Sequence, residues 1–351
     1  FFAYVAYTTP HAPLQAPDFL IDKYEQHFYE LGFEGLKHAR FEAQKKLGII
    51  PQDAKYPDAS KNHLLRTWAS LSDEDRRRMA RVMATYAAML ESQDYSVGLI
   101  LNYLRETGQL DDTLIVYLSD NGPEGTDVQG ELSNPAATQW AQKNFSQAFE
   151  DIGNGDSYVF IGTDFANAVT GGLSWWKWFI GEGGIRTPLI IVPPSNATFA
   201  RKTQKTAEYA HVKDVPTTIL DYAGVGPAPQ GYKGRKIVAP SGVSMRSFIE
   251  GKSERPRTED QWVAFELFGN SFVVAGNYKA MRVRTGMYGD GQWHLYDIRN
   301  DPAETTQLEG AQPERLKRMI AIYDSYAKEK GIVPVAENWS PWHGFIEEQT
   351  P

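Results

Sequence analysis

The fold of this chain is indicated most clearly by Thr113-Leu114-Ile115-Val116-Tyr117-Leu118-Ser119-Asp120-Asn121-Gly122. The first six residues form an apolar run that follows a predicted helix, which is typical of a buried strand in a parallel sheet. The four residues after it are turn-forming, so the strand ends there. Ligands of open α/β sheets bind beyond the carboxyl ends of such strands, which makes Asp120 and Asn121 the first site candidates.

The sequence around this strand alternates between predicted helices and short apolar strands. Helical patterns are predicted at 20–31, 34–47, from Asp73 onward, through 97–104 and at 214–223, and further strands at 1–7 and 188–192. Residues 122–172 are polar and glycine-rich without clear periodicity. The alternation predicts a large α/β domain over residues 1–252, with a doubly wound, mostly parallel sheet flanked by helices.

The pattern changes after Lys252, where a charged, turn-rich linker begins. Short strands separated by glycine-bearing turns are predicted at 262–268, 271–275, 279–283 and 293–296, followed by a helix at 313–330. Residues 253–351 are therefore expected to form a small α+β domain with an antiparallel sheet and a packing helix. The tail that carries Trp339, Trp342 and Phe345 is expected to pack on the body.

Composition excludes several classes of function. The net charge of −8 over 351 residues argues against nucleic-acid binding, which needs a basic face. The chain has no cysteine, which removes disulfides, cysteine-ligated zinc and thiol catalysis. No apolar run reaches the roughly 18–20 residues that span a bilayer. Periplasmic, extracellular and cytoplasmic locations all stay open.

The chain begins in an unusual way. Its first seven residues, 1–7, start with Phe and read as a strand already under way. We therefore expect this chain to be a fragment, whose partner is a front segment of the same protein.

Asp120 and Asn121 place one carboxylate and one amide oxygen in a tight turn, and hard divalent cations take ligands of that kind. An Asp-Asn-Gly turn that satisfies only its own backbone is the alternative. His11 stands between Pro10 and Pro13 directly after a strand, where an imidazole could protonate a leaving oxygen. The alternative is a loop histidine bonded to a carbonyl.

Lys177 lies in an aromatic run, Trp175-Trp176-Lys177-Trp178-Phe179, just before Gly183-Gly184. A lysine there could meet an anion as a point charge, or extend past the rings to water. Because each candidate follows or borders an apolar strand, we expect His11, Asp120, Asn121 and Lys177 to meet at one edge of one sheet.

Together these motifs resemble those of the sulfatases of the alkaline-phosphatase superfamily, most closely the bacterial arylsulfatase branch. Five elements occur in the family's order: Thr9–Pro17 around the histidine, Leu118–Gly122 after Gly108–Leu114, Lys177 with Glu182–Pro188, Asp214–Gly224, and Leu295-Tyr296-Asp297 with Asp301–Glu304 and Leu308.

The resemblance implies a role for each candidate. Asp120 and Asn121 match two of four calcium ligands, His11 matches the histidine that protonates the leaving oxygen, and Lys177 matches the lysine that binds a sulfate oxygen. The implied substrate is a sulfate ester, either a small molecule or a sulfated glycan. The implied nucleophile is a formylglycine made from Cys or Ser in a C/S-x-P-x-R motif.

The sequence departs from the family in its front part. It contains neither that motif nor the first pair of metal-binding aspartates, so we expect this chain alone to be inactive. Two alternatives to a sulfatase stay open: a phosphodiesterase or phosphonate monoester hydrolase of the same superfamily, and a catalytically inactive binding relative.

Overall fold

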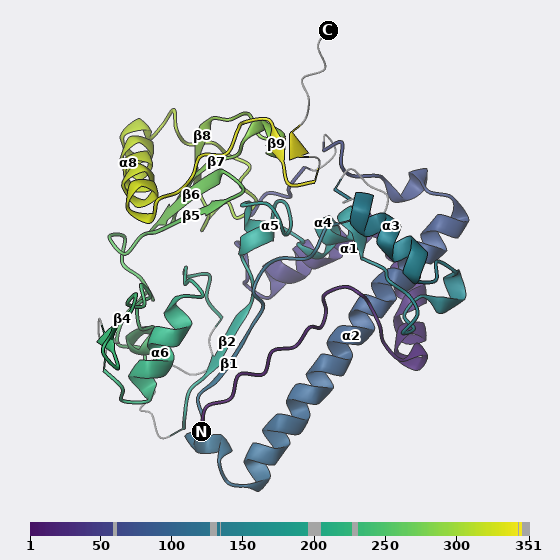
Figure 1. Ribbon diagram of the computed structural model, residues 1–351, viewed down its shortest axis with the longest axis horizontal. Coiled ribbons are helices and arrows are strands. Elements are labelled where there is room, and N and C mark those ends of the chain that lie inside the picture. Colours follow the sequence, from purple (N-terminus) through teal and green to yellow (C-terminus); the bar gives the residue numbers. More distant parts are fainter. Residues whose placement is uncertain are drawn as a thin grey trace.

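A computed structural model of the chain describes residues 1–58, 62–126, 132–133, 135–195, 205–226, 231–342 and 344–345 (Figure 1). Two long helices and a β-strand pair build one part, and a four-stranded sheet with the helix α8 builds the other. Among the described residues, no helix combines the length and the apolar character that crossing a membrane requires.

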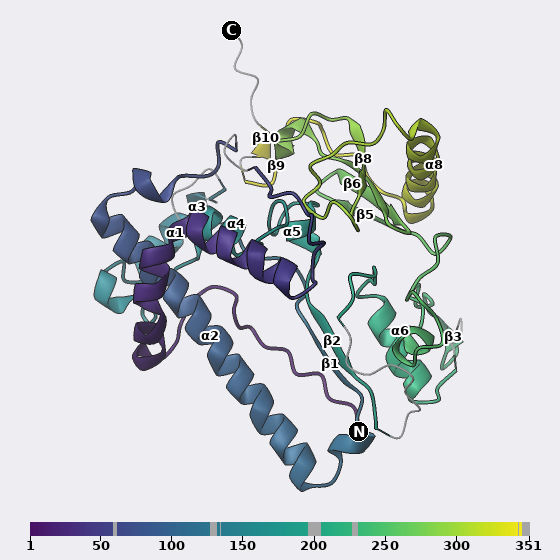
Figure 2. The same cartoon turned by 180° about the vertical axis from the view of Figure 1, so that it is seen from behind.

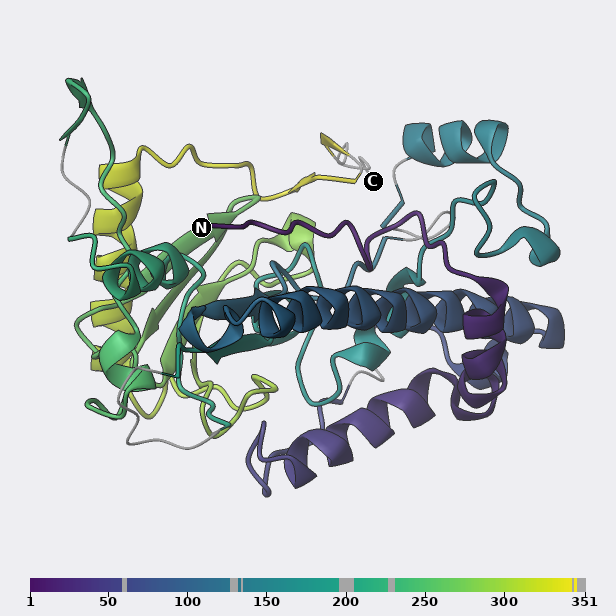
Figure 3. The ribbon, with the colours of Figure 1, turned by 90° about the horizontal axis from the view of Figure 1, so that it is seen from below.

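The two long helices are α1 (Asp18–Lys46) and α2 (Asp73–Glu106). Gly32 interrupts α1 with φ 61° and ψ −166°, so the helices predicted at 20–31 and 34–47 are its two halves. The patterns predicted from Asp73 and through 97–104 belong to the single helix α2, which runs across most of the molecule when seen from below (Figure 3). Ser72 caps its N-terminus by accepting a hydrogen bond from the backbone N–H of Asp75.

The predicted strand at 113–118 is β1 (Ile115–Leu118), and it pairs with β2 (Leu189–Val192). The pairing is antiparallel, with Ile115 opposite Val192 and Leu118 opposite Leu189, so the parallel direction expected for this pair is wrong. An apolar run indicates burial but not strand direction, because direction depends on how the intervening chain returns. The residues of β1 are half-buried, and most of β2 is exposed.

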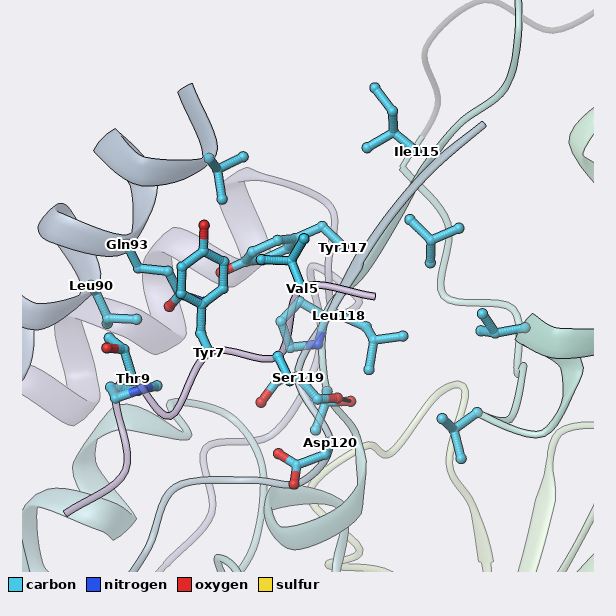
Figure 4. A pocket seen from close by; sticks show the side chains of 18 of the residues that line it. Val5, Tyr7, Thr9, Leu90, Gln93, Ile115, Tyr117, Leu118, Ser119 and Asp120 are labelled. Atoms are coloured by element: carbon cyan, nitrogen blue, oxygen red, sulfur yellow. Dashed lines mark hydrogen bonds between the residues drawn. The ribbon is translucent and has the colours of Figure 1, made fainter. Parts of the chain in front are cut away.

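Residues 1–7, predicted as a strand, have no strand pairing in the structure. They form an extended segment that lines one cavity together with β1 and α2, with Val5 and Tyr7 near Tyr117 and Leu90 (Figure 4). A strand needs a hydrogen-bonded neighbour, and none of the described residues supplies one here. Most of this segment is consequently exposed, Phe1 by 83%.

The main core lies between α1, α2 and α4 (Gly162–Val169). Phe165 of α4 is fully buried, with its ring centroid 4.8 Å from that of Phe33 on α1. This helix, α3 (Pro135–Asn144) and the short helix η3 (Phe149–Asp151) occupy the stretch 122–172, where the sequence shows no periodicity. Two helical turns are too few for a clear 3.6-residue pattern.

The C-terminal sheet has the order β5-β6-β7-β8, with every neighbour antiparallel. Its strands are β5 (Val263–Leu267), β6 (Asn270–Ala275), β7 (Tyr278–Arg282) and β8 (Trp293–Asp297). Helix α8 (Pro313–Lys330) covers one face by burying Met319 against Leu295 and Ala280 (Figure 2). The predicted mixed α/β architecture with a C-terminal antiparallel sheet and helix is confirmed, whereas the domain boundary at 252 stays a prediction.

The remaining elements are short. They are η1 (Trp68–Ser70), η2 (Leu110–Asp112), α5 (Glu182–Ile185), α6 (Asp214–Tyr222), β3 (Gly231–Tyr232), β4 (Arg235–Lys236), α7 (Arg246–Ile249), η4 (Thr285–Met287), β9 (Trp339–Ser340) and β10 (Gly344–Phe345). Within the tail, which was expected to pack on the surface of the body, Trp342 is buried in the main core.

Substituting Gly32 by Ala should destabilise the protein by about 1–3 kcal/mol. The new Cβ would lie 2.5 Å from the Trp68 ring, at a φ that side chains rarely adopt. Gly35→Ala in the same helix is the matched control, because its Cβ meets nothing closer than 3.6 Å. That control should stabilise by up to about 1 kcal/mol. Urea unfolding of both variants measures the difference, and equal midpoints would contradict the packing described here.

Candidate functional site

The turn after β1 packs directly on α5, backbone against backbone. The N–H of Gly122 donates to the carbonyl of Gly184 at 2.8 Å. A Cβ on Gly122 would lie 1.9 Å from the carbonyl oxygen of Gly183, so only glycine fits. The Asp120-Asn121 turn is thereby fixed beside α5.

The loop that carries Lys177 folds onto the same two elements. The N–H of Lys177 donates to the carbonyl of Pro123 at 3.0 Å, and that of Gly183 to the carbonyl of Ser174 at 2.7 Å. Both residues flanking this part of the loop, Trp175 and Trp178, have positive φ angles of 68° and 83°. Such a conformation costs a residue with a side chain roughly 1–2 kcal/mol, so packing must hold the loop in place.

His11 contacts Lys177. The His11 Nδ1–H donates to the carbonyl of Ala12 at 2.9 Å, which leaves Nε2 as an acceptor. The Lys177 ammonium lies 3.1 Å from this Nε2. The carbonyl bond that we considered as the alternative role of His11 is therefore present, and it orients the ring toward Lys177.

Glu124 completes this cluster and was missed by the sequence analysis. Its Oε2 lies 2.8 Å from the Lys177 ammonium and 4.0 Å from His11 Nε2, and its side chain is only 13% exposed. Trp178 Nε1–H and the Thr126 hydroxyl donate to Oε1 at 2.7 and 2.5 Å. Glu124 follows a proline in a polar loop, and nothing in the surrounding sequence distinguishes a buried glutamate there from a solvent-exposed one.

The pKa of Glu124 is lowered from its ordinary value. Burial alone would raise this pKa, but hydrogen bonds from Lys177, Thr126 and Trp178 stabilise the carboxylate and outweigh the burial. Glu124 is thus an anion that fixes the Lys177 ammonium beside His11.

Asp120 and Asn121 line the same cavity as His11 and Glu124. Figure 4 shows Asp120 in this cavity. Asp120 is exposed, and its Oδ1 accepts the N–H of Asn121 at 3.1 Å. The Asn121 amide donates to the carbonyl of Gly122 at 2.7 Å, so its oxygen is the atom left for another partner. The cavity is a wide cleft of about 2310 Å³, larger than the usual 300–1,000 Å³ ligand pocket.

These two side chains fit calcium in ligand chemistry, because Ca²⁺ takes carboxylate and amide oxygens. They supply only part of the six to eight oxygens that the ion needs. The part of the chain that the structure describes contains no cluster of three or more acidic or histidine side chains arranged for a metal. The turn is thus at most one portion of a metal site.

Comparisons with known proteins show the family of the chain. The family model described as Sulfatase matches residues 1–225. An uncharacterized sulfatase of Schizosaccharomyces pombe is 34% identical, covering 97% of this chain and 60% of that relative. The arylsulfatase of Klebsiella aerogenes is 31% identical over 74% of this chain and 53% of its own length.

The fold is also similar to a solved structure. The crystal structure of Ps i-CgsB in complex with k-i-k-neocarrahexaose aligns with a TM-score of 0.51 and 20% identity, covering 92% of this chain and 49% of that one. The chain belongs to the sulfatase family. It spans between about half and three-fifths of the length of the curated relatives named above.

Glu124→Gln should destabilise the protein at pH 7 by about 1–3 kcal/mol, because charged hydrogen bonds to Lys177 and its neighbours are lost. The lowered pKa sets the pH dependence: the contribution of Glu124 is fully present above the ordinary pKa of 4.5 and is lost as the pH falls through the folded-state pKa. Urea unfolding from pH 7 to pH 3 should therefore show the gap between variant and wild type closing. The exposed Glu254, changed to Gln, is the control, and a gap that stays constant would refute this role of Glu124.

Proposed function

We propose that the protein hydrolyses sulfate monoesters, and aryl sulfates in particular, at the cluster of His11, Lys177 and Glu124. The observation that carries this proposal is the 3.1 Å contact between Lys177 Nζ and His11 Nε2 beside the Asp120-Asn121 turn. It places a cation and a proton carrier next to each other, as the departure of an alcohol from a sulfate ester requires. The identity to the Klebsiella aerogenes arylsulfatase supports the same reaction class.

Each residue has a distinct role in this proposal. The Lys177 ammonium binds a sulfate oxygen next to the bridging oxygen, where negative charge builds up as the S–O bond breaks. Once the Lys177 ammonium binds the sulfate instead of Nε2, His11 takes up a proton at Nε2 and donates it to the bridging oxygen, so that the neutral alcohol or phenol leaves. Glu124 fixes Lys177 in position, and Trp178 donates a hydrogen bond to the same carboxylate.

Calcium and the nucleophile complete the proposed site. Asp120 and Asn121 would hold part of the coordination shell of Ca²⁺, which balances the charge of the sulfate oxygens when bound. Residues 1–351 contain no Cys and no Ser-x-Pro-x-Arg motif from which a formylglycine could form. We propose that this group is supplied by sequence outside these residues, and that residues 1–351 alone are inactive.

The direct test is a parallel assay of the native protein with 4-nitrophenyl sulfate and bis(4-nitrophenyl) phosphate. A higher kcat/KM for the sulfate ester is the expected result. Preference for the diester would assign the protein to the phosphodiesterases or phosphonate monoester hydrolases, and no turnover of either would favour an inactive binding relative.

The two central residues should differ in their dependence on the leaving group. His11→Gln should lower kcat/KM for phenyl sulfate by about 10²–10⁴-fold but much less for 4-nitrophenyl sulfate, whose phenolate leaves without a proton. Lys177→Met should lower both by about 10²–10³-fold, because it removes charge stabilisation from either reaction. The exposed His27→Gln and Lys252→Met are matched controls. Equal losses with both esters for His11→Gln would exclude it as the proton donor.

Asp120→Asn should weaken calcium binding by about tenfold or more, because it removes the carboxylate of the turn. Added Ca²⁺ should raise the unfolding midpoint of the native protein, since a ligand that binds only the folded state stabilises it. The calcium concentration that gives half of this shift is the measurement. Asp111→Asn on η2 is the control, and a variant at Asp120 with unchanged calcium response would remove this turn from the metal site.

A further inference from the structure

The C-terminal sheet contributes one fully buried charge to the large part of the molecule. Lys279, in the middle of β7, has no solvent exposure. Its ammonium lies 2.5 Å from the carbonyl of Ile180, 3.1 Å from Glu182 Oε1 and 2.7 Å from Glu304 Oε1. Ile180 and Glu182 lie at the far end of the loop that presents Lys177, so this side chain joins the sheet to the loop by polar contacts beside the apolar packing of Ile180 on the sheet.

The turn at Asp301–Glu304 holds both ends of the same loop. At its front end, the Ser174 hydroxyl donates to the carbonyl of Ala303 at 2.5 Å. At its far end, the N–H of Glu182 donates to Glu304 Oε2 at 2.9 Å. Glu304 itself has a positive φ of 54°, an unfavourable conformation that the surrounding contacts must maintain. Residues 174–182, defined here as the lysine loop, are thus anchored at both ends by the C-terminal part of the chain.

Stability alone does not explain why this anchor is ionic. Two carboxylates and one ammonium are removed from water here, and replacing such buried charges by apolar residues is often neutral or stabilising. Burial raises the pKa of Glu304 to about 7, with Glu182 adding to the increase and Lys279 opposing it. Other titratable groups that face the cluster are Arg186, at 3.9 Å from Glu182 Oε2, the half-buried Tyr209 and the buried Tyr296. The charged groups instead define the conformation of the loop, because each of their hydrogen bonds fixes the position of one loop atom.

We propose that Lys279 and Glu304 are positioning residues for Lys177, through which the C-terminal sheet holds the lysine loop in the conformation that presents its ammonium to His11. This inference deepens the proposed function and rests on it for the role of Lys177. The positive φ angles of Trp175 and Trp178 must be maintained by contacts from outside the loop. The hydrogen bonds at Ser174, Ile180 and Glu182 are such contacts.

The first test is hydrogen exchange in residues 174–184, followed by mass spectrometry in this 351-residue chain. Lys279→Met should accelerate exchange of the Lys177 and Gly183 amides by at least about tenfold, while α8 and α2 keep their protection. Lys252→Met, which removes an exposed ammonium that pairs with Glu250, is the matched control and should change nothing in this loop. Unchanged loop exchange in Lys279→Met would overturn the proposal, and so would equal acceleration throughout the chain.

Glu304→Gln is the second variant, and it preserves the size of the side chain. Because the pKa of Glu304 is raised, this carboxyl group is protonated in the folded protein at pH values where it is ionised in the unfolded one. Protection of the loop amides from exchange should therefore fall as the pH rises from about 5 to 7 and then level off. After correction for intrinsic exchange, Glu304→Gln should lack this pH dependence. An identical pH dependence in both proteins would contradict the role of Glu304.

A double-mutant cycle in the native protein links position to activity. Lys279→Met should lower kcat/KM for 4-nitrophenyl sulfate by about tenfold or more in the wild type but have little further effect beside Lys177→Met, since it acts through that lysine. Additive losses would overturn the proposal. If the native protein hydrolyses no sulfate ester, the proposed function fails, and the exchange measurements still decide whether Lys279 positions the loop.

Discussion

The close backbone contact between the turn after β1 and helix α5 determines the arrangement of everything around the site. A Cβ on Gly122 would lie 1.9 Å from the carbonyl oxygen of Gly183, and a Cβ on Gly183 or Gly184 would lie 2.1 or 2.3 Å from a carbonyl oxygen of the lysine loop. Gly183 and Gly184 in turn contact the backbone of the lysine loop, at Trp175 and Trp176. Because the turn after β1 and the continuous segment 174–185 share this contact, the Asp120-Asn121 turn and Lys177 are fixed relative to each other.

The features that carry strong local patterns could be predicted from the sequence. Helix α8 was predicted at its observed bounds, and the strands of the C-terminal sheet within a residue or two, because alternating apolar residues and glycine turns define them well. His11 and Lys177 contact each other, but the reason expected from the sequence does not apply, because residues 1–7 before His11 pair with no described strand. Their catalytic roles, and the metal role of Asp120 and Asn121, remain predictions.

Features that depend on which other segment a stretch of chain packs against could not be predicted from the stretch itself. The antiparallel direction of β1 and β2 and the unpaired state of residues 1–7 are set by neighbours in space, which a single apolar run does not reveal. Glu124 and Lys279 carry no distinguishing pattern either. One is an acid in a loop and the other a lysine in a strand, and only the contacts of the folded chain show that both act on the lysine loop.

The proposed hydrolysis requires His11 and Lys177 to contact the same substrate group. A crystal structure of the native protein with inorganic sulfate and calcium tests this most directly. We predict one sulfate ion within hydrogen-bonding distance of both His11 Nε2 and Lys177 Nζ, with the calcium ion bound by Asp120 and Asn121. Sulfate bound elsewhere while these side chains stay unoccupied, or calcium bound away from the Asp120-Asn121 turn, would contradict the account.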